Sequence, residues 1–379
     1  METYLVGGAV RDELLGLEVG ERDWVVVGGS AEELEARGYR RVGHDFPVFL
    51  HPGTGEEYAL ARTEHKSGHG YHGFEIHAGR DVTLTEDLAR RDLTINAMAR
   101  DSAGCVIDPW GGRADLAAGL LRHVSPAFSE DPLRVLRVAR LAARLAPMGF
   151  TVAQETRALM RTMSATGELD WLVPERVWRE TARALGEPAV VTYFTTLADC
   201  HALARVFPEL APQFTPAPSS IGASALGHAC ALTSDASIRL AALCAPGAIV
   251  TGRVETLAAR LPIPRQWLTL AQCIAQWYER CLDLAPAASP IARLLDGLDA
   301  LRRRERFEAI LTACDALAAA HCTRDWPQKR RLLDQARAHA AALGGQPLAH
   351  EGWRGPALGH ELQRRRTAAI ARLLEQTHG

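Results

Sequence analysis

The sequence lacks several features that would assign it to a class at once. Its eight cysteines, at positions 105, 200, 230, 244, 273, 281, 314 and 322, form no CxxC pair, so we expect reduced thiols rather than disulfides or zinc ligands. It has no run of about 18 apolar residues that could span a membrane. The N-terminus, METYLVGGAVRDELLG, has no basic segment before an apolar run. We therefore expect no signal peptide and a cytoplasmic location.

The sequence also lacks an excess of charge of either sign. Its 43 Lys and Arg and 45 Asp and Glu residues leave a formal net charge of −2 over 379 residues. This balance gives no global sign of a nucleic-acid partner, so any RNA contacts would come from local basic clusters. A hydrophobic content of 47% is typical of a globular chain, and the length predicts two or three domains.

Strand-like and helix-like segments alternate in the N-terminal part. Apolar runs at 4–6, 24–27, 48–50 and 58–61 predict strands, and 9–15 predicts a helix that ends at Gly16. From about Asp131 onward, Ala, Leu, Arg and Glu recur at helical spacing, with a break at 211–220. We therefore expect an α/β head at 1–125, an all-α neck at 126–210, and an all-α body and tail at 211–379.

Two features of the head indicate phosphate chemistry. Gly7 and Gly8 separate the first predicted strand from the first helix. Paired glycines let backbone N–H groups approach a phosphate, which Arg11 in the next helical turn could also reach, although they equally fit a plain tight turn. Glu21 and Asp23 are two apart at a strand entry, so their carboxylates would share one face. Such a pair suits Mg²⁺; a solvated strand entry is the alternative.

These residues resemble the first motif of class II tRNA nucleotidyltransferases and bacterial poly(A) polymerases. Four further segments resemble the family's other motifs, in the family's order. They are 90–98 (RRDLTINAM), linked to ribose and triphosphate binding; Asp108-Pro109 with Gly112 and Asp115-Leu116, which joins head to neck; 130–134 (EDPLR), which selects the nucleotide; and 175–180 (ERVWRE), which supports the neck. The resemblance is closest to bacterial CCA-adding enzymes and includes 62–74, where that family has a flexible loop needed for the final A.

The resemblance implies a template-independent enzyme that adds CCA to the 3′ end of tRNA from CTP and ATP. The RNA 3′-hydroxyl would attack the nucleotide α-phosphate in a Mg²⁺-dependent step that releases pyrophosphate. Glu21 and Asp23 would be the catalytic and metal-binding residues. Nucleotide binding is assigned to Gly8, Arg11, Arg91, Asp131, Arg134, Arg137 and Arg140. The sequence indicates no membrane partner and no obligate protein partner.

One departure from the family lies at the metal site. The family usually carries Asp-x-Asp, whereas this chain has Glu21 and Asp23. Glutamate supplies a carboxylate on the same face but one methylene further out, so we expect metal binding with shifted geometry. Glu57, at the entry of another predicted strand, is a possible third acidic residue or simply an exposed charge.

The nucleotide-selecting segment suggests how a base could be chosen. Asp131 and Arg134 are three apart and would share one face of a helix. Aspartate accepts from an exocyclic amine, and arginine donates in a fork. Cytosine and adenine both place an amine beside a ring-nitrogen acceptor, so such a pair would accept C and A and reject U and G. Arg144, further along the same stripe, would face solvent or RNA.

The C-terminal half offers less. Many proteobacterial relatives carry a phosphohydrolase domain of the HD type there, but the matching region, 243–247, reads LCAPG and has no His-Asp pair. His228 alone could not hold the metal, so we expect no phosphohydrolase activity. Basic clusters at 302–304, 329–331 and 364–366 could contact tRNA phosphates, or could be solvated helix faces.

Three other functions stay open at this point. Poly(A) polymerases carry a Gly-Arg-Arg-Phe-like stretch in the head, whereas this chain has GHDFP at 43–47. An RNA-binding relative without activity is suggested by Glu21 and by the missing hydrolase ligands. The third is a specialised CC-adding or A-adding enzyme, and the intact segment 62–74 argues against a CC-adder.

Overall fold

The computed structural model describes residues 1–42, 48–66, 74–214 and 220–378. The chain forms two compact units, one of Met1–Ala184 with Thr192–Pro208 and the other of Leu185–Val191 with Glu209–Gly379. All residues that the sequence assigns to catalysis, metal or nucleotide binding lie in the first unit.

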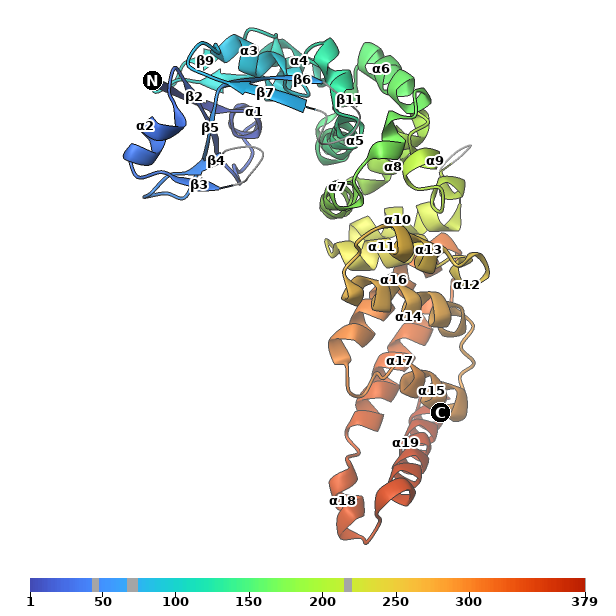
Figure 1. Ribbon diagram of the computed structural model, residues 1–379. Helices are drawn as coiled ribbons and strands as arrows, with labels where there is room; N and C mark the ends of the chain where they lie inside the picture. The colour runs from blue at the N-terminus through green and yellow to red at the C-terminus, as the bar shows by residue number, and fades with distance from the viewer. Residues whose placement is uncertain (43–47, 67–73, 215–219, 379) are drawn as a thin grey trace. The chain divides into compact units, whose positions relative to one another are not determined.

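Among the residues that the structure describes, seven strands form a mixed sheet in the first unit (Figure 1). In spatial order they are β3 (Arg40–Val42), β4 (Val48–Leu50), β5 (Glu57–Leu60), β2 (Asp23–Val27), β1 (Glu2–Val6), β8 (Ala99–Arg100) and β9 (Val106–Ile107). β2 and β5 are parallel, and the other neighbours are antiparallel. Two smaller pairings join β6 (Arg62–Lys66) to β7 (Phe74–Ala78), and β10 (Leu120–Leu121) to β11 (Thr151–Val152).

The alternation of side chains along β2 directs it into two apolar layers. Val25 packs on one face in a cluster with Leu88, and Val26 packs on the other in a cluster with Leu34 and Phe49. Residues two apart in a strand share a face, so Asp23 lies on the same side of the sheet as Val25. The strand thus anchors itself through its apolar residues and carries its acidic residue to one end.

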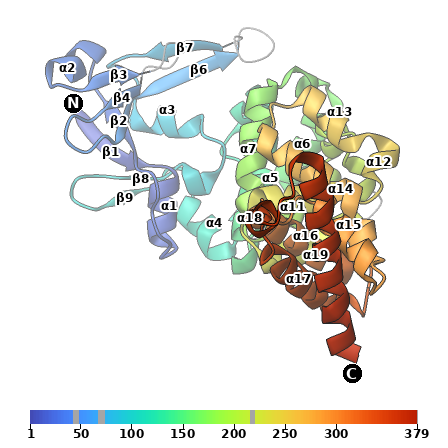
Figure 2. The ribbon, with the colours of Figure 1, turned by 90° about the horizontal axis from the view of Figure 1, so that it is seen from below.

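The helices up to residue 206 are α1 (Gly8–Leu14), α2 (Ala31–Ala36), α3 (Leu84–Ala89), α4 (Gly112–Ala118), α5 (Leu133–Leu145), α6 (Gln154–Ala165), α7 (Pro174–Gly186), α8 (Val190–Asp199) and α9 (Leu203–Val206). α3 begins at a capping box in which Thr83 and Glu86 satisfy each other's backbone N–H groups. α1 packs beside β9 in a cluster that includes Val10 and Val106 (Figure 2).

Among its described residues, the second unit contains helices and their connecting loops, and no strand. Its helices after residue 220 are α10 (Ile221–Leu232), α11 (Ala236–Cys244), α12 (Ala248–Thr251), α13 (Arg253–Arg260), α14 (Arg265–Leu282), α15 (Ala288–Gly297), α16 (Arg304–Ala320), α17 (Trp326–Ala341), α18 (Gly345–His350) and α19 (Gly355–His378). α10, α11, α14 and α16 pack on one another, and α19 packs against α15 and α17.

The expected fold class, an α/β head followed by helical segments, is confirmed. The predicted strands at 4–6, 24–27 and 48–50 lie within β1, β2 and β4, and the predicted helix at 9–15 overlaps α1. The short strands β8 to β11 were not predicted, because two residues carry too little hydrophobic pattern to indicate a strand.

Gly112, the first residue of α4, packs directly on a neighbouring backbone. A Cβ atom there would lie 2.4 Å from the carbonyl oxygen of Thr94 and 2.8 Å from Cγ of Met98. We expect Gly112→Ala to lower the free energy of unfolding by about 1–3 kcal/mol, the usual cost of overpacking. Chemical denaturation would measure it against Gly20→Ala, since a Cβ at Gly20 meets nothing within 4 Å. Equal stability of the two variants would contradict the close contact.

Candidate active site

Two glycines connect β1 to α1 in a turn that carries positive charge. The backbone at Gly7 adopts a φ of 72°, which glycine reaches without the steric cost of a Cβ. Its N–H donates to the Met98 carbonyl at 3.2 Å. A Cβ at Gly7 would lie 3.0 Å from Nη1 of Arg91, and one at Gly8 would lie 3.4 Å from Nη2 of Arg11. Both guanidinium groups therefore lie against the turn.

Buried carboxylates hold these two arginines. Nη2 of Arg11 lies 2.7 Å from Asp12 Oδ1, and Nη2 of Arg91 lies 3.1 Å from Asp87 Oδ2. Burial lowers the pKa of Arg11, and the charge of Asp12 opposes that shift. Burial also works against ionisation of Asp87, but Arg91 and Arg90 outweigh it and hold the pKa of Asp87 below its ordinary value. The positive charge at the turn is thus fixed in place.

The acidic residues lie at the entry of two neighbouring strands. Asp23 begins β2, Glu57 of β5 is its partner in the parallel register, and Glu21 lies two residues before Asp23. Among the described residues, neither Glu21 nor Asp23 forms a hydrogen bond or ion pair through its carboxylate. Although Asp23 is open to solvent on one side, burial by the surrounding protein raises its pKa; Arg91 opposes the rise and Glu21 adds to it.

The donor set fits one kind of cation better than others. Within the described parts of the chain, no group of three or more Asp, Glu, His or Cys side chains is placed to hold a metal. A structural zinc site, which needs about four protein ligands, is therefore not formed by these residues. Mg²⁺ commonly uses one or two carboxylates and takes its remaining ligands from phosphates and water. Glu21 and Asp23, which form no ion pair with any cation in the described part of the chain, suit that requirement.

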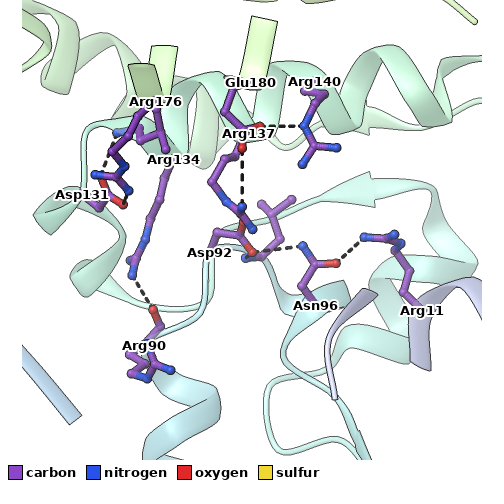
Figure 3. A network of polar contacts seen from close by, with 12 residues as sticks. Arg11, Arg90, Asp92, Asn96, Asp131, Arg134, Arg137, Arg140, Arg176 and Glu180 are labelled. Atoms are coloured by element: carbon purple, nitrogen blue, oxygen red, sulfur yellow. Dashed lines mark hydrogen bonds and ion pairs between the residues drawn. The ribbon is translucent and has the colours of Figure 1, made fainter. Parts of the chain in front are cut away.

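A polar network links α1 to α5 (Figure 3). Nη1 of Arg11 donates to Oδ1 of Asn96 at 2.6 Å, and Nδ2 of Asn96 donates to Oδ1 of Asp92 at 3.0 Å. The other oxygen of Asp92 accepts from Nε of Arg137 at 2.8 Å. Burial works against ionisation of Asp92, yet Arg137 and the amide of Asn96 hold its pKa well below the ordinary value. Asp92 is therefore a buried anion that depends on its partners.

The network continues from α5 to α7 through Glu180. Nε of Arg140 lies 2.7 Å from Glu180 Oε2, and Nη1 of Arg137 lies 3.8 Å from Oε1 (Figure 3). The charge of Asp92 raises the pKa of Arg137; burial opposes this and Glu180 adds to it. Arg137 thus joins two carboxylates, and it also lies close enough to Asp23 to oppose the rise in that residue's pKa. The structure places Arg137 and Arg140 beside the same carboxylate, and nucleotide binding by either stays a prediction.

Asp131 and Arg134 do not share a helix face, contrary to the argument from their spacing. Asp131 has extended backbone and precedes α5, which starts at Leu133, whereas Arg134 lies inside the helix. Asp131 pairs with Arg176 at 2.9 Å. Arg134 is buried and donates to the carbonyl oxygen of Arg90 at 2.5 Å. The physical reason is Pro132, which lies directly before the first residue of the helix. A proline there favours an extended conformation at the preceding residue, Asp131.

Arg144 also differs from expectation, since it does not simply face solvent or RNA. Its Nη2 lies 2.9 Å from Oδ2 of Asp12, whose other oxygen is bound by Arg11. Asp12 is 4% exposed, and buried carboxylates are normally paired with cations. Arg144 therefore ties the end of α5 to α1.

Loss of this tie should destabilise the contact between α1 and α5. We expect Arg144→Gln to lower the free energy of unfolding by about 1–2 kcal/mol, because the buried Asp12 carboxylate loses one charged hydrogen bond. Chemical denaturation would measure it, with Arg113→Gln on exposed α4 surface as the control. An Arg144→Gln variant as stable as this control would contradict the contact.

Sequence reasoning assigned no role to several members of the network. Asp92 and Asn96 lie within the second motif, Arg176 and Glu180 lie within the fifth, and Asp12 follows Arg11. Asp92 and Asn96 are four apart, but the backbone between them is extended at Leu93, so helical spacing did not signal their contact. The pairings across 45 and 40 residues, Arg137–Asp92 and Arg140–Glu180, had no local signal at all.

The basic clusters of the second unit are partly neutralised within that unit. Arg303 pairs with Asp299, Lys329 with Asp325, Arg330 with Asp315, Arg364 with Glu361 and Arg365 with Glu351. Arg302, Arg304 and Arg331 are exposed. His228 lies exposed on α10. RNA contact by any of the three clusters, and the lack of phosphohydrolase activity, stay predictions.

Two predictions fall partly on residues outside the described ranges. The segment 43–47, used against poly(A) polymerase, and residues 67–73 of the expected loop at 62–74 are not among the described residues. Of the helices that are described, none combines the length and the apolar composition that a membrane crossing needs.

Family models match two segments of the chain. Residues 3–122 match a model described as the poly A polymerase head domain, and residues 149–214 match one described as the probable RNA and SrmB-binding site of polymerase A. The first match contains the glycine turn, the carboxylates and Asp92. The second covers α6, α7 and α8.

Relatives match the chain along its whole length. The multifunctional CCA protein of Thioalkalivibrio sulfidiphilus is 51% identical over 412 residues, with 100% of both chains covered. That of Pseudomonas aeruginosa is 47% identical over 409 residues, with 99% of both covered.

Solved structures share the fold at lower identity. A Thermotoga maritima CCA-adding enzyme complexed with tRNA gives a TM-score of 0.69 at 19% identity, covering 99% of this chain and 90% of that one. A Bacillus stearothermophilus CCA-adding enzyme in complex with CTP gives 0.67 at 24% identity, covering 97% and 88%.

Proposed function

The chain belongs to the family of bacterial multifunctional CCA proteins, and from this premise we propose that it adds and repairs the 3′-terminal CCA of tRNA from CTP and ATP. The observation that carries the proposal is the position of Arg91. This side chain lies against the Gly7 turn and also opposes the rise in the pKa of Asp23. This position supports a single site that combines the glycine turn with the carboxylates of Glu21 and Asp23.

The chain's own residues would hold the nucleotide by charge. Gly8 leaves the backbone open to the triphosphate, and Arg91 and Arg137 flank the same site. Arg140 is placed beside Arg137 by their shared partner Glu180. Arg11 is 5% exposed, so its contribution is a fixed positive charge beneath the turn. Nucleotide binding by all five residues is part of this proposal.

Glu21 and Asp23 would hold Mg²⁺ at the strand entry. Bound there, Mg²⁺ would act as a Lewis acid on phosphate oxygens and lower the pKa of the attacking 3′-hydroxyl. The raised pKa of Asp23 supports this role, since a carboxylate at that position is poorly compensated by protein alone. Glu57, beside Asp23 in the register, is placed to influence the same site.

Asp131 and Arg134 would read the base. Both lie next to residues of the second motif, since Arg134 donates to the carbonyl of Arg90 and Asp131 contributes to the raised pKa of Arg137. Aspartate accepts from the exocyclic amine of cytosine or adenine, and arginine donates to the ring nitrogen. Uracil and guanine present the reverse order, so their carbonyl oxygen would face the aspartate acceptor and their ring N–H would face the arginine donor.

The tRNA would be held by the helical segments at 126–210 and 211–379, by shape more than by sequence. The exposed arginines Arg302, Arg304 and Arg331 are the members of the basic clusters best placed to reach phosphates. All eight cysteines are free thiols, which supports a cytoplasmic location.

A primer-extension assay tests the proposed function. The purified chain is incubated with tRNA transcripts that end before, within and after CCA, with each nucleotide alone, and with or without Mg²⁺. We expect C to be added to the transcript that lacks CCA, A to be added only after CC, and the complete end to stay unextended. Long A tails would indicate a poly(A) polymerase. No extension by the natural chain, but extension after Glu21→Asp, would indicate an RNA-binding relative.

A further inference from the structure

Asp131 is attached to two elements at once. Its Oδ1 accepts from the backbone N–H of Leu133 at 3.0 Å, and its Oδ2 pairs with Nη2 of Arg176 on α7 at 2.9 Å (Figure 3). A carboxylate oxygen has two lone pairs, so these contacts leave acceptor capacity for an incoming amine. The side chains of Asp131 and Arg176 are 20% and 27% exposed, so a base can approach them.

Arg134 is anchored elsewhere. Its Nη1 donates to the carbonyl oxygen of Ala127 at 2.7 Å and its Nη2 to that of Arg90 at 2.5 Å. Ala127 belongs to the 3₁₀ turn Pro126–Glu130, and Arg90 ends α3. Asp131, the proposed acceptor for the base, and Arg134, the proposed donor, are therefore fixed by different parts of the first unit.

We infer that Arg176 is the positioning residue that sets nucleotide choice, because its ion pair with Oδ2 of Asp131 fixes the carboxylate that would accept from the exocyclic amine of C or A. This inference rests on the proposed function. Two contacts fix the Asp131 carboxylate in one orientation, whereas the contact to Leu133 alone permits rotation about the side-chain torsions. A rotated carboxylate would no longer present its acceptor in the direction of that amine.

General support of the neck does not account for the position of Arg176. α7 is tied to α5 by Glu180, which pairs with Arg140 at 2.7 Å. It is also anchored by Val177 and Trp178, which are 4% and 9% exposed. We therefore expect α7 to stay in place when Arg176 is replaced. No other side-chain cation among the described residues contacts Asp131 at ion-pair distance.

The test compares Arg176→Gln with Arg176→Lys and with Arg183→Gln, an exposed arginine on the same helix. The ratio of kcat/KM for CTP to that for UTP is measured on tRNA that lacks CCA. We expect Arg176→Gln to lower this ratio about 10-fold or more, the scale of a lost charged hydrogen bond. Arg176→Lys should restore part of it, and Arg183→Gln should match the natural chain. Thermal unfolding of each variant checks that it folds.

A second arm asks whether Arg176 acts through Asp131. In an Asp131→Asn background, adding Arg176→Gln should leave the CTP-to-UTP ratio where Asp131→Asn alone puts it. An equal fall in both backgrounds, or an equal loss for every nucleotide, overturns the inference. Equilibrium binding of CTP and UTP to the same proteins separates the two proposals. A natural chain that binds CTP over UTP but extends no tRNA refutes the proposed function, whereas an unchanged binding ratio in Arg176→Gln refutes the inference.

Discussion

Asp23→Ala should reduce the rate of nucleotide addition by about 1000-fold or more, the scale on which loss of one pre-placed charged group in an active site is felt. Removing this carboxylate leaves Glu21 as the remaining acid of the proposed metal-binding pair. It also removes the charge that interacts with Arg91 and Arg137. The affinity for tRNA should change less than about twofold, since a phosphate backbone is held by cations and not by this acid. Single-turnover extension and a direct tRNA-binding titration would measure the two effects separately.

The matched control is Glu35→Ala, an exposed acid on α2 of the same unit, which should extend tRNA at the natural rate. Glu57→Ala gives a further comparison, because Glu57 neighbours Asp23 in the register and a smaller loss there would mark an indirect role. If Asp23→Ala kept more than about a tenth of the rate, or lost rate only in step with its thermal stability, the placing of the catalytic site at this strand entry would be wrong.

Asp92→Asn should be the most destabilising single change in the polar network. Asp92 is 6% exposed, and its two oxygens accept from Leu93 N, Asn96 Nδ2 and Arg137 Nε. An amide placed there would turn N–H groups toward a guanidinium and leave Arg137 without its main counter-charge. Breaking a buried pair costs about 3–5 kcal/mol, and the partial exposure of Arg137 reduces this to about 2–4 kcal/mol. Urea unfolding at neutral pH would measure it.

The stability lost in Asp92→Asn should depend on pH, in a direction that follows from the pKa of Asp92. Because the folded protein holds the pKa of Asp92 below its ordinary value, the ionised form stabilises the fold at every pH above the unfolded value of about 4. This contribution is lost as the pH falls through the folded value. The gap in stability between the natural chain and Asp92→Asn should therefore be full at pH 7 and narrow below about pH 4. Glu18→Gln, an exposed acid, should show no such gap. A gap that widened in acid would show that Asp92 is not held as an anion.

The fold and the list of site residues could be predicted from sequence for a clear physical reason. β1, β2 and β4 contain short runs of apolar β-branched, aromatic and leucine residues, and such runs between turn signals indicate a strand locally. The site residues lie in short segments whose order along the chain resembles one family. Glu57 was noted as an acid near a strand entry, and the register places it beside Asp23.

What the sequence could not predict is how the charged residues pair. Helical spacing put Asp131 and Arg134 on one face, but Asp131 precedes the helix and binds Arg176 instead. The same stripe led to Arg144 being placed toward solvent or RNA, whereas the buried Asp12 attracts it. The first error has a local cause, since Pro132 leaves Asp131 extended before the helix. The second arises because spacing along a helix says nothing about an opposite charge that arrives from a distant part of the chain.

The links between α5 and the sheet region bear on where the chain can be divided. A fragment that stopped at residue 125 would keep the strands and the glycine turn, yet Asp92 would lose Arg137, Asp12 would lose Arg144 and the Arg90 carbonyl would lose Arg134. This fragment would contain two buried carboxylates and one carbonyl oxygen without their arginine partners. The sheet and the helices up to Ala184 belong to one compact unit, and these three contacts predict that residues 1–125 alone are less stable than they are within that unit.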